Sequence, residues 1–361
     1  MSRVIHRPRT ALLALGAAAV LLAGPAVASA AKSAAADLGF LFGLSTSKDG
    51  SLLVADATQG IVAIRGGERT LFAPLPGVTD VAAIGNGVVF AITGGPVGIY
   101  DGESNHDPNG TAARLYRVSR GQAQEIADLG LFEIQNNPHP AEFDSNPFGL
   151  TVLNGGGVLV ADAGGNSIIY ADVTGAIDWV ATLPTELGST ANIKALFGCP
   201  AGPPDFCLLP DMIPTEPVAT DVVIGPDGAA YVSELKGFPA PAGESRVWRI
   251  EPGSVHAECG TSDACQVVAD GFTSIVDLDF GPDGTLYVTE LDEASWWAVE
   301  VFQAPTGGTI NACQWGSFPL TCSEVATGLP IPMSTTIGGD GSLYTTIWSL
   351  VPGLADVVAV P

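Results

Sequence analysis

The side chains with the clearest potential for chemistry are carboxylates that flank short apolar hairpins. In DLDFGPDGTLYVTE (277–290), Asp277 stands before the first apolar strand and Glu290 stands after the second. Carboxylate oxygens are the ligands that Ca²⁺ and Mg²⁺ prefer. Similar hairpins recur along the chain, and aligning them on their turns gives two positions at which acids recur. The acids at these positions are Asp80, Asp221 and Asp277 before the turn, and Glu234 and Glu290 after it.

What these acids can do depends on where the fold places them. We expect Asp80, Asp221 and Asp277 at one mouth of a central channel, where like charges repel and each carboxylate needs compensation. A bound cation, with Ca²⁺ favoured, would supply it, as would bridging waters, nearby hydrogen-bond donors or raised pKa values. Asp56 and Asp162 also end second strands, and we interpret them as acceptors for the backbone of the turn that follows.

The hairpin pattern occurs six times and determines the predicted fold. Each copy has a short apolar strand, a turn rich in Asp, Asn and Gly, and a second strand rich in Val, Leu and Tyr. Glycine accepts the positive φ that such turns require, so the pattern is a strong hairpin signal. The six hairpins span residues 42–56, 79–93, 148–162, 220–234, 277–290 and 333–347.

Two weaker strands follow the hairpins, which gives a repeating unit of four strands. Repeated four-stranded units are typical of a β-propeller. We therefore predict an all-β fold, a six-bladed β-propeller of four-stranded antiparallel blades, as a single domain over residues 31–361. The last unit ends after a third strand, and residues 32–40 are predicted to supply its outer strand and so close the ring.

The first thirty residues have the pattern of a secretory signal. Three arginines precede an apolar run that starts at residue 11, and ASA (28–30) has the small residues of a cleavage site. Cleavage after Ala30 is predicted. The alternative, a retained membrane anchor, is disfavoured because the apolar run is too short to span a bilayer. The mature chain is thus expected to be secreted, extracellular and without a membrane span.

The net charge excludes several classes of partner. The sequence has 14 Lys and Arg against 38 Asp and Glu, a formal charge of −24, and loss of the three arginines in the signal would make it −27. Such a surface repels nucleic acid and anionic lipid. Basic residues for an anionic cofactor are scarce, so neither a nucleotide nor a flavin is expected. We expect a monomer.

Six cysteines in an exported chain indicate disulfides. Of the fifteen possible pairings, the spacing favours the three local ones. A zinc site is not indicated, because there is no CxxC motif and no nearby histidine pair. The predicted bridges are Cys199–Cys207, Cys259–Cys265 and Cys313–Cys322.

The longest connections are predicted to emerge at the channel mouth that bears the acids. Loops of this length are commonly functional, so this mouth is the predicted binding surface. DGESNHDPNG (101–110) has oxygen-bearing side chains at alternate positions, but it lacks the glycine and the closing glutamate of a calcium loop, so a solvated loop is favoured. His139 lies between prolines and is expected at the surface. The connections span 94–112, 130–147, 184–219, 235–244 and 291–296.

Aromatic side chains on these loops offer a second means of recognition, because they could stack on a sugar or a peptide. For Phe148 and Trp296, packing between blades is an equally supported interpretation. The aromatic residues are Phe132, Phe143, Phe148, Phe238 and Trp296.

Several longer stretches resemble the ScyD/ScyE family of secreted propeller proteins. The resemblance covers most of the mature chain and implies an exported propeller. It brings no established activity and no catalytic residues. The stretches are DSNPFGL (144–150), VADAGGN (160–166), ATDVVIGPDGAAYVSELKGFP (219–239), SRVWRIEPG (245–253) and GFTSIVDLDFGPDGTLYVTEL (271–291).

Two functional hypotheses remain, since no GxSxG, phosphate-loop or HExxH motif occurs. The favoured one is a non-catalytic binding protein that recognises an extracellular protein, a glycan or a small molecule through the acidic mouth. The alternative is a metal-dependent lactonase- or lyase-like enzyme. In that enzyme Asp221 and Asp277 would hold the cation, and Glu234 or Glu290 would act as the general base.

Overall fold

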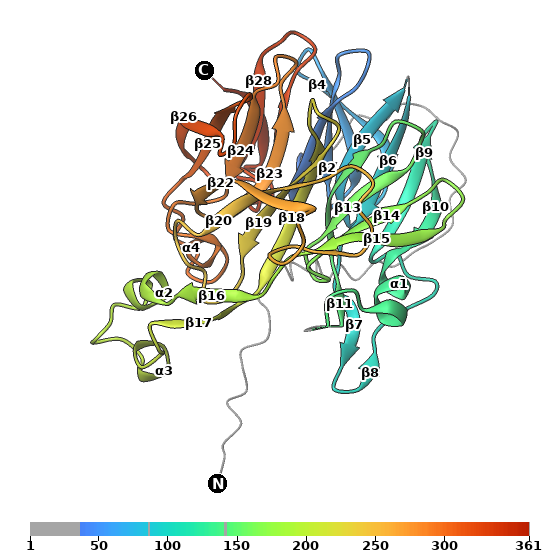
Figure 1. The fold of residues 1–361 in the computed structure, drawn as a ribbon. Coiled ribbons are helices and arrows are strands. Elements are labelled where there is room, and N and C mark those ends of the chain that lie inside the picture. Colours follow the sequence, from blue (N-terminus) through green and yellow to red (C-terminus); the bar gives the residue numbers. More distant parts are fainter. Residues whose placement is uncertain (1–36, 86, 141–142, 361) are drawn as a thin grey trace.

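The computed structural model describes residues 37–85, 87–140 and 143–360. The predicted signal peptide, residues 1–30, lies outside these residues. Antiparallel strands build most of the described chain, and the helices are confined to connections (Figure 1). The predicted all-β class is therefore confirmed.

The six predicted hairpins open six sheets, and consecutive strands within each sheet are antiparallel. The first sheet has β1 (Leu41–Thr46), β2 (Leu52–Asp56), β3 (Gly60–Arg65) and β4 (Glu68–Pro74). The second has β5 (Val78–Gly85), β6 (Val88–Thr93), β9 (Arg114–Ser119) and β10 (Gln122–Asp128). The third has β12 (Pro147–Val152), β13 (Val158–Asp162), β14 (Ser167–Ala171) and β15 (Ile177–Thr182), with the short parallel strand β21 (Ala257–Glu258) beside β15.

The remaining three sheets come from the C-terminal part of the chain. The fourth has β18 (Pro217–Ile224), β19 (Ala230–Lys236), β20 (Ser245–Ile250) and β22 (Cys265–Phe272). The fifth has β23 (Ile275–Phe280), β24 (Leu286–Glu290), β25 (Gly308–Gln314) and β26 (Thr321–Leu329). The sixth has β27 (Thr335–Ile337), β28 (Leu343–Ile347) and β29 (Asp356–Ala359).

The first strands of the six sheets lie beside one another. Contacts join β1 to β5, β5 to β12, β12 to β18, β18 to β23 and β23 to β27, and β27 in turn contacts β1. Two hydrogen bonds support the last contact. The Leu44 amide donates to Ser334 Oγ over 2.9 Å, and Thr46 Oγ1 donates to Ile337 O over 2.8 Å. The first and sixth sheets are therefore neighbours although they lie at opposite ends of the described chain.

The tight hairpin turns follow from their Asp-Gly sequences. Gly228 and Gly284 have φ values of 79° and 86°, in the left-handed region that glycine adopts without a steric penalty. The preceding aspartates accept hydrogen bonds from the residues that enter the second strand: Ala229 N donates to Asp227 Oδ1 (3.2 Å) and Thr285 N donates to Asp283 Oδ1 (3.0 Å). These turns set the register between the first and second strands.

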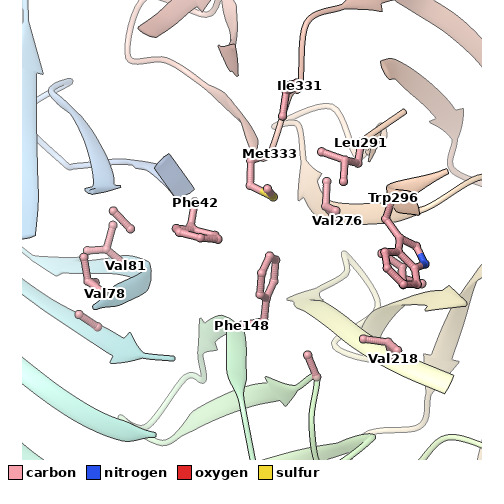
Figure 2. Packing of buried hydrophobic residues seen from close by; sticks show 14 of the residues in the cluster. Phe42, Val78, Val81, Phe148, Val218, Val276, Leu291, Trp296, Ile331 and Met333 are labelled. Atoms are coloured by element: carbon pink, nitrogen blue, oxygen red, sulfur yellow. The ribbon is translucent and has the colours of Figure 1, made fainter. Parts of the chain in front are cut away.

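Apolar side chains fill the centre of the ring of first strands. Figure 2 shows Phe42 of β1, Phe148 of β12 and Met333, which precedes β27, close together in the middle. The rings of Phe42 and Phe148 meet edge to face, with centroids 5.8 Å apart, a favourable aromatic geometry. All three side chains are buried. The packing interpretation of Phe148 is therefore confirmed.

Other parts of the core join pairs of neighbouring sheets. Tyr231 of the fourth sheet packs in one cluster with Leu278 of the fifth. Leu44 of the first sheet packs in another with Tyr344 and Val357 of the sixth. Burial of apolar area between sheets, at about 25 cal/mol per Å², therefore stabilises their arrangement around the centre.

The sixth sheet differs from the expected four-stranded unit. Within the described residues it has three strands, and residues 37–40 of the expected outer strand form no strand. They instead contact the connection between β28 and β29, where Gly353 N donates to Leu38 O (3.0 Å). Gly39 N donates to Asp56 Oδ2 (2.9 Å), which holds this segment against the end of β2. Residues 32–36 lie outside the described residues.

Two groups of inserted elements lie at the lower edge of Figure 1, as predicted for the connections at one mouth. The first group comes from two connections: β7 (Val97–Tyr100) and β8 (Glu103–Ser104) follow β6, whereas α1 (Leu129–Asn136) and β11 (Asp144–Ser145) follow β10, and β11 pairs with β7. The second has β16 (Glu186–Ser189), α2 (Ala191–Leu196), α3 (Pro204–Cys207) and β17 (Met212–Thr215). A further helix, α4 (Trp296–Glu300), follows β24. Among the described residues, no helix has the length and apolar character needed to cross a membrane.

The three predicted disulfides are confirmed. Cys199–Cys207 joins the segment after α2 to the end of α3, Cys259–Cys265 joins the residue after β21 to the first residue of β22, and Cys313–Cys322 links paired positions of β25 and β26. Each bridge is local, so the disulfides brace individual connections and one sheet rather than joining distant parts of the chain.

Candidate functional site

Asp221 lies within electrostatic reach of both Asp80 and Asp277, the other two predicted channel aspartates. Burial and the nearby Asp221 raise the pKa of both Asp80 and Asp277 well above its usual value. Burial raises the pKa of Asp221 itself to about 7. Asp279, two residues beyond Asp277 on β23, belongs to the same group, and burial raises its pKa to about 6. Together these residues form the aspartate cluster.

Each predicted aspartate joins its own first strand to the next one around the ring. Asp80 Oδ2 accepts from the Leu150 amide over 2.7 Å, and Asp221 Oδ2 accepts from the Leu278 amide over 2.9 Å. Asp277 Oδ2 accepts from the Thr335 amide over 2.8 Å. A carboxylate that accepts backbone N–H groups is stabilised in its charged form, which offsets part of the cost of burial. The compensation predicted for these acids therefore includes backbone donors.

Glycines make room for two of these carboxylates. A Cβ atom on Gly43 would lie 1.8 Å from Asp80 Oδ1, and one on Gly149 would lie 2.2 Å from Asp221 Oδ1. Gly43 and Gly149 hold the positions equivalent to the aspartates on their own strands. Asp80 Oδ1 accepts from the adjacent Val81 amide over 2.7 Å, so one carboxylate serves two strands. The alternation of glycine and aspartate thus follows from close packing between first strands.

The geometry does not by itself supply a metal site. Across the described ranges, no group of three or more His, Cys, Asp and Glu side chains is arranged to hold a metal ion. In the aspartate cluster, the Oδ2 atoms of Asp80, Asp221 and Asp277 are directed to backbone donors. The Ca²⁺ site at these three residues remains a prediction.

Glu234 and Glu290 each accept one hydrogen bond from the third strand of their own sheet and one from another donor nearby. Glu234, which is fully buried, accepts from Lys236 Nζ and from Trp248 Nε1, the latter over 2.6 Å. Glu290 accepts from the Thr273 amide and from Asn311 Nδ2, the latter over 2.6 Å. Burial raises the pKa of Glu290 to about 7. Both glutamates are therefore engaged away from the amides that the aspartate cluster binds.

The turn-capping role of Asp56 and Asp162 is confirmed. Asp56 Oδ1 accepts from the Thr58 amide over 2.8 Å. Asp162 Oδ1 accepts from the Gly164 and Gly165 amides over 3.1 and 2.9 Å. These carboxylates order the connection that leaves each second strand, as side-chain to backbone bonds in turns generally do.

In the 101–110 loop, two of the alternating side chains bond to nearby backbone. Asn105 Oδ1 accepts from Gly98 N over 2.8 Å, and Asp107 Oδ1 accepts from Asn109 N over 2.9 Å. His139 was expected at the surface, but it is buried, and burial lowers its pKa. The prolines around it do not expose it, because its side chain lies beside the backbone of Leu183, the residue that follows β15.

A group of polar side chains centred on His106, which the sequence did not indicate, lies beside α1. His106 Nε2 is 2.8 Å from Asp128 Oδ2 and 3.2 Å from a guanidinium nitrogen of the buried Arg114. Asp128 also caps α1 by accepting from the Leu131 amide over 2.8 Å. This group fastens the 101–110 loop to the start of the helix. Residues 106, 114 and 128 have no regular spacing that could have revealed it.

The second insertion forms a structured platform, defined here as residues 186–216. Cys199–Cys207 closes it, and the rings of Phe197 and Phe206 stack with centroids 3.8 Å apart. Both rings also meet Trp297 of α4 edge to face. Asn192 Nδ2 donates to Ala240 O over 2.7 Å. The long connection predicted over 184–219 is therefore a braced element rather than an irregular loop.

The platform exposes aliphatic side chains. Leu208 is 81% exposed, Leu187 62% and Met212 47%. Of the aromatic residues predicted for recognition, Trp296 is buried, Phe132 lies near Trp179, and Phe238 packs near Trp297. Phe143 is exposed. The platform thus exposes three apolar, non-aromatic side chains, while other connections expose Ile99, Phe143, Val301 and Phe302.

Comparisons with known proteins establish the fold alone. No protein-family model and no curated protein matches the chain. Among solved structures, a catalytically inactive virginiamycin B lyase from Staphylococcus aureus with quinupristin is 16% identical, covering 92% of this chain and 87% of that one, with a TM-score of 0.50. A putative oxidoreductase (glucose dehydrogenase) from Thermus thermophilus is 15% identical, covering 91% and 98%, with a TM-score of 0.51. A Bacteroides thetaiotaomicron protein of unknown function is 11% identical, covering 87% and 68%, with a TM-score of 0.52. The chain therefore has a β-propeller fold.

Proposed function

We propose that this chain is an exported, non-catalytic binding protein of the ScyD/ScyE type that recognises a partner through its long-loop face. One contrast carries the proposal. The aspartates expected to do chemistry hold neighbouring first strands together, as the bond from the Leu278 amide to Asp221 illustrates. The platform, by comparison, directs Leu187 and Met212 into solvent.

The proposal includes six blades and a single mature domain over residues 31–361. Its support is the succession of six sheets whose first strands contact one another in chain order, with β27 beside β1. Secretion after cleavage at Ala30 is supported by the three disulfides, which form and persist in oxidising compartments. We propose a monomer, because the formal charge of −27 on the mature chain opposes self-association.

A capture experiment tests the proposal. The mature chain, residues 31–361, would be immobilised and exposed to the secreted proteins and glycans of its source, alongside an Asp221→Asn/Asp277→Asn variant. We expect saturable, stoichiometric capture of one component by both proteins, because the two aspartates act within the fold. The absence of stoichiometric capture, or turnover of a substrate that the variant cannot perform, would contradict a non-catalytic binding role.

The metal-dependent lactonase- or lyase-like enzyme is a second candidate, and one observation favours it. Burial places the pKa values of Asp221 and Glu290 at about 7 and that of Asp279 at about 6, the range suited to general acid–base catalysis near neutral pH. A Ca²⁺ ion held by Asp221 and Asp277 would polarise a carbonyl oxygen. Glu290 suits the role of base better than Glu234, which is already paired with Lys236.

The enzyme hypothesis has its own test. It requires a stoichiometric divalent cation after purification, turnover of a lactone, and loss of both in Asp221→Asn/Asp277→Asn. It also requires a melting temperature that rises with Ca²⁺ in the wild type and not in the variant, since a ligand that binds only the native state stabilises it. Identical melting curves in Ca²⁺ and in chelator for both proteins would contradict both the cation site and the enzyme hypothesis.

A further inference from the structure

The geometry points to the platform as a docking surface for a basic segment of another protein, anchored by aliphatic side chains. This inference rests on the proposed binding function and names the chemistry of the partner. Leu187, Leu208 and Met212 supply the apolar contacts, and exposed carboxylates of the same insertion supply the charge. Two of these apolar residues, Leu187 and Met212, lie on the two-stranded ribbon in which β16 pairs with β17.

The ribbon buries the face that carries Thr215 and exposes the face that carries the apolar side chains. Glu186 pairs with Thr215 and Leu187 with Pro214, so alternate positions point to opposite faces. Thr215 is buried, and a Cβ on Gly188 would lie 2.1 Å from Thr215 Oγ1 and 3.3 Å from Pro241, so this face packs on the body of the protein. The opposite face presents Leu187 and Met212 to solvent. Exposed apolar side chains grouped on one element mark an interaction surface.

The ribbon is fixed at its base before any partner arrives. Glu186 Oε2 lies 3.0 Å from Lys236 Nζ and 2.9 Å from an Arg246 guanidinium nitrogen. The Ser189 amide donates to Glu244 Oε1 over 3.1 Å. A surface that is already ordered loses less conformational entropy on binding than a flexible loop does. The platform is therefore suited to docking without rearrangement.

Docking is expected through side chains rather than by addition of a strand. The Ser189 amide points to Glu244, so the edge of β16 on that side is already used. On β17, Pro214 has no N–H group, and proline at a strand edge disfavours pairing with a further strand. The solvent-facing side chains are what remains available to a partner.

The charge of the platform determines the kind of segment that fits. Residues 186–216 contain four acids and one lysine, and of the acids Glu186 is compensated by Lys236 and Arg246 at the base of the ribbon. The Asp211 side chain is fully exposed at one end of its ion pair with Lys194, and Asp205 is exposed on α3. A partner with Lys or Arg beside apolar residues would complement this surface, and opposite charges also speed association.

The same charge argues against other occupants. A second copy of the mature chain would carry another net charge of −27, and an anionic membrane would repel the protein in the same way. A glycan would need exposed aromatic faces on which sugar rings could stack. On the platform the rings of Phe197 and Phe206 instead stack on each other. A basic protein segment is the occupant that agrees with both the charge and the side-chain types.

Synthetic peptides test this inference directly. The probe is an amphipathic peptide of leucine and lysine, compared with one in which glutamate replaces lysine and one in which serine replaces leucine. Binding to residues 31–361 would be measured by fluorescence anisotropy. We expect Leu187→Ser/Met212→Ser to weaken binding of the leucine–lysine peptide at least tenfold. The matched control is Val173→Ser/Leu354→Ser, which removes two exposed apolar side chains elsewhere (53% and 59% exposed) and should leave affinity unchanged.

Charge is tested with a second variant. Asp205→Asn/Asp211→Asn should weaken binding and reduce its dependence on salt concentration, because surface attraction is screened by ions. Equal affinity for the lysine and glutamate peptides, or equal binding by the platform variant and its control, would overturn the inference. So would a dimer in sedimentation that Leu187→Ser/Met212→Ser abolishes.

The failure of this inference can be told apart from failure of the proposed function. If a partner captured in the earlier experiment is retained by Leu187→Ser/Met212→Ser, the binding function stands and the docking surface lies elsewhere. If no partner is captured by either protein, the binding function itself is wrong.

Discussion

The Thr335 amide donates a hydrogen bond of 2.8 Å to Asp277 Oδ2 and so joins β23 to β27. Ser334 Oγ donates to the other carboxylate oxygen of Asp277 over 2.7 Å and accepts from the Leu44 amide of β1 over 2.9 Å. Three first strands are therefore linked through two side chains. Since the fifth, sixth and first sheets meet here, this link joins the two ends of the described chain.

Removing the Ser334 hydroxyl should destabilise the protein. Ser334→Ala leaves a buried Asp277 oxygen and the Leu44 amide without their donor and acceptor, and unsatisfied buried groups cost about 1–3 kcal/mol each. Urea unfolding of the variant should show a lower midpoint with an unchanged slope. Thr174→Ala, in an exposed turn, is the control and should lie within about 0.5 kcal/mol of wild type. A midpoint equal to that of the control would show that the link carries no stability.

Adding a methyl group at Gly149 should be strongly unfavourable. The new Cβ would meet Asp221 Oδ1 at 2.2 Å and the Asp221 Cα at 2.7 Å, and a backbone atom cannot move aside as a side-chain end can. Overpacking of this kind costs about 1–3 kcal/mol or more. Gly85→Ala is a matched control in a neighbouring first strand, because nothing lies within 4 Å of its Cβ position. Thermal melts of the two variants should differ clearly, and equal melts would contradict the close approach.

Sequence reasoning predicted the meeting of the acids but not what they bind. The hairpin repeat placed Asp80, Asp221 and Asp277 at equivalent positions, and equivalent positions in repeated units come together when the units surround a centre. Which group each carboxylate accepts from depends on the offset between first strands of different sheets. No local pattern encodes that offset. The need for glycine at position 149 could not be predicted for the same reason, because the residue that it contacts, Asp221, belongs to the next sheet.

The ordered structure of the platform could not be predicted from the sequence, for a different reason. The residues Glu186–Ser189 and Met212–Thr215 are short, contain glycine and proline, and are separated by more than twenty residues, so they do not have the signature of a hairpin. At the end of the ribbon the Thr190 amide donates to Asp211 O over 3.0 Å, and the segment between the strands is braced internally by the disulfide and the aromatic stack. Only the folded ribbon reveals that Leu187 and Met212 share the solvent-facing side.

The aspartate cluster should make stability fall as pH rises. Burial raises the pKa of Asp221 from an ordinary value of 3.8 to about 7, so between these values the native state binds more protons than the unfolded state. Stability is then greatest below about pH 4 and declines up to about pH 7. One pKa unit corresponds to about 1.4 kcal/mol, so the contribution of this group is a few kcal/mol at most.

The measurement is urea unfolding at several pH values for wild type and Asp221→Asn. The variant should show a shallower decline between pH 4 and pH 7, because its amide does not titrate. Asp80, Asp277, Asp279 and Glu290, whose pKa values are also raised, still contribute to the decline. Asp172→Asn is the control: this aspartate is exposed, and hydrogen bonds with Thr174 lower its pKa, so the slope in that range should stay as in wild type. A rise in wild-type stability over the same range would mean that a cation, rather than a proton, compensates the cluster.

Two disulfides of nearly equal loop size should differ in what they stabilise. Cys199–Cys207 spans a sequence separation of 8 and lies in the platform, whereas Cys313–Cys322 spans 9 and crosses β25 and β26. Replacing the first pair with serine should speed hydrogen exchange over residues 186–216 and leave the melting temperature of the sheets almost unchanged. Replacing the second should lower the melting temperature, with about 2–3 kcal/mol lost on a chain-entropy estimate. Equal global effects would mean that the platform unfolds only together with the sheets.

Removing one member of the buried Lys236–Glu234 ion pair should destabilise the protein strongly, whereas replacing both members together should destabilise it much less. Both side chains are almost completely inaccessible, so Lys236→Met strands the Glu234 carboxylate with Trp248 and Arg246 and should cost about 3–5 kcal/mol. Glu234→Gln/Lys236→Met removes both charges and should recover much of that loss, since apolar replacement of a buried pair is often close to neutral. Because Lys236 also holds Glu186 at the base of the ribbon, both variants should increase hydrogen exchange in β16. A double variant as unstable as the single one would show that the hydrogen bonds around Glu234, rather than its charge, determine the cost.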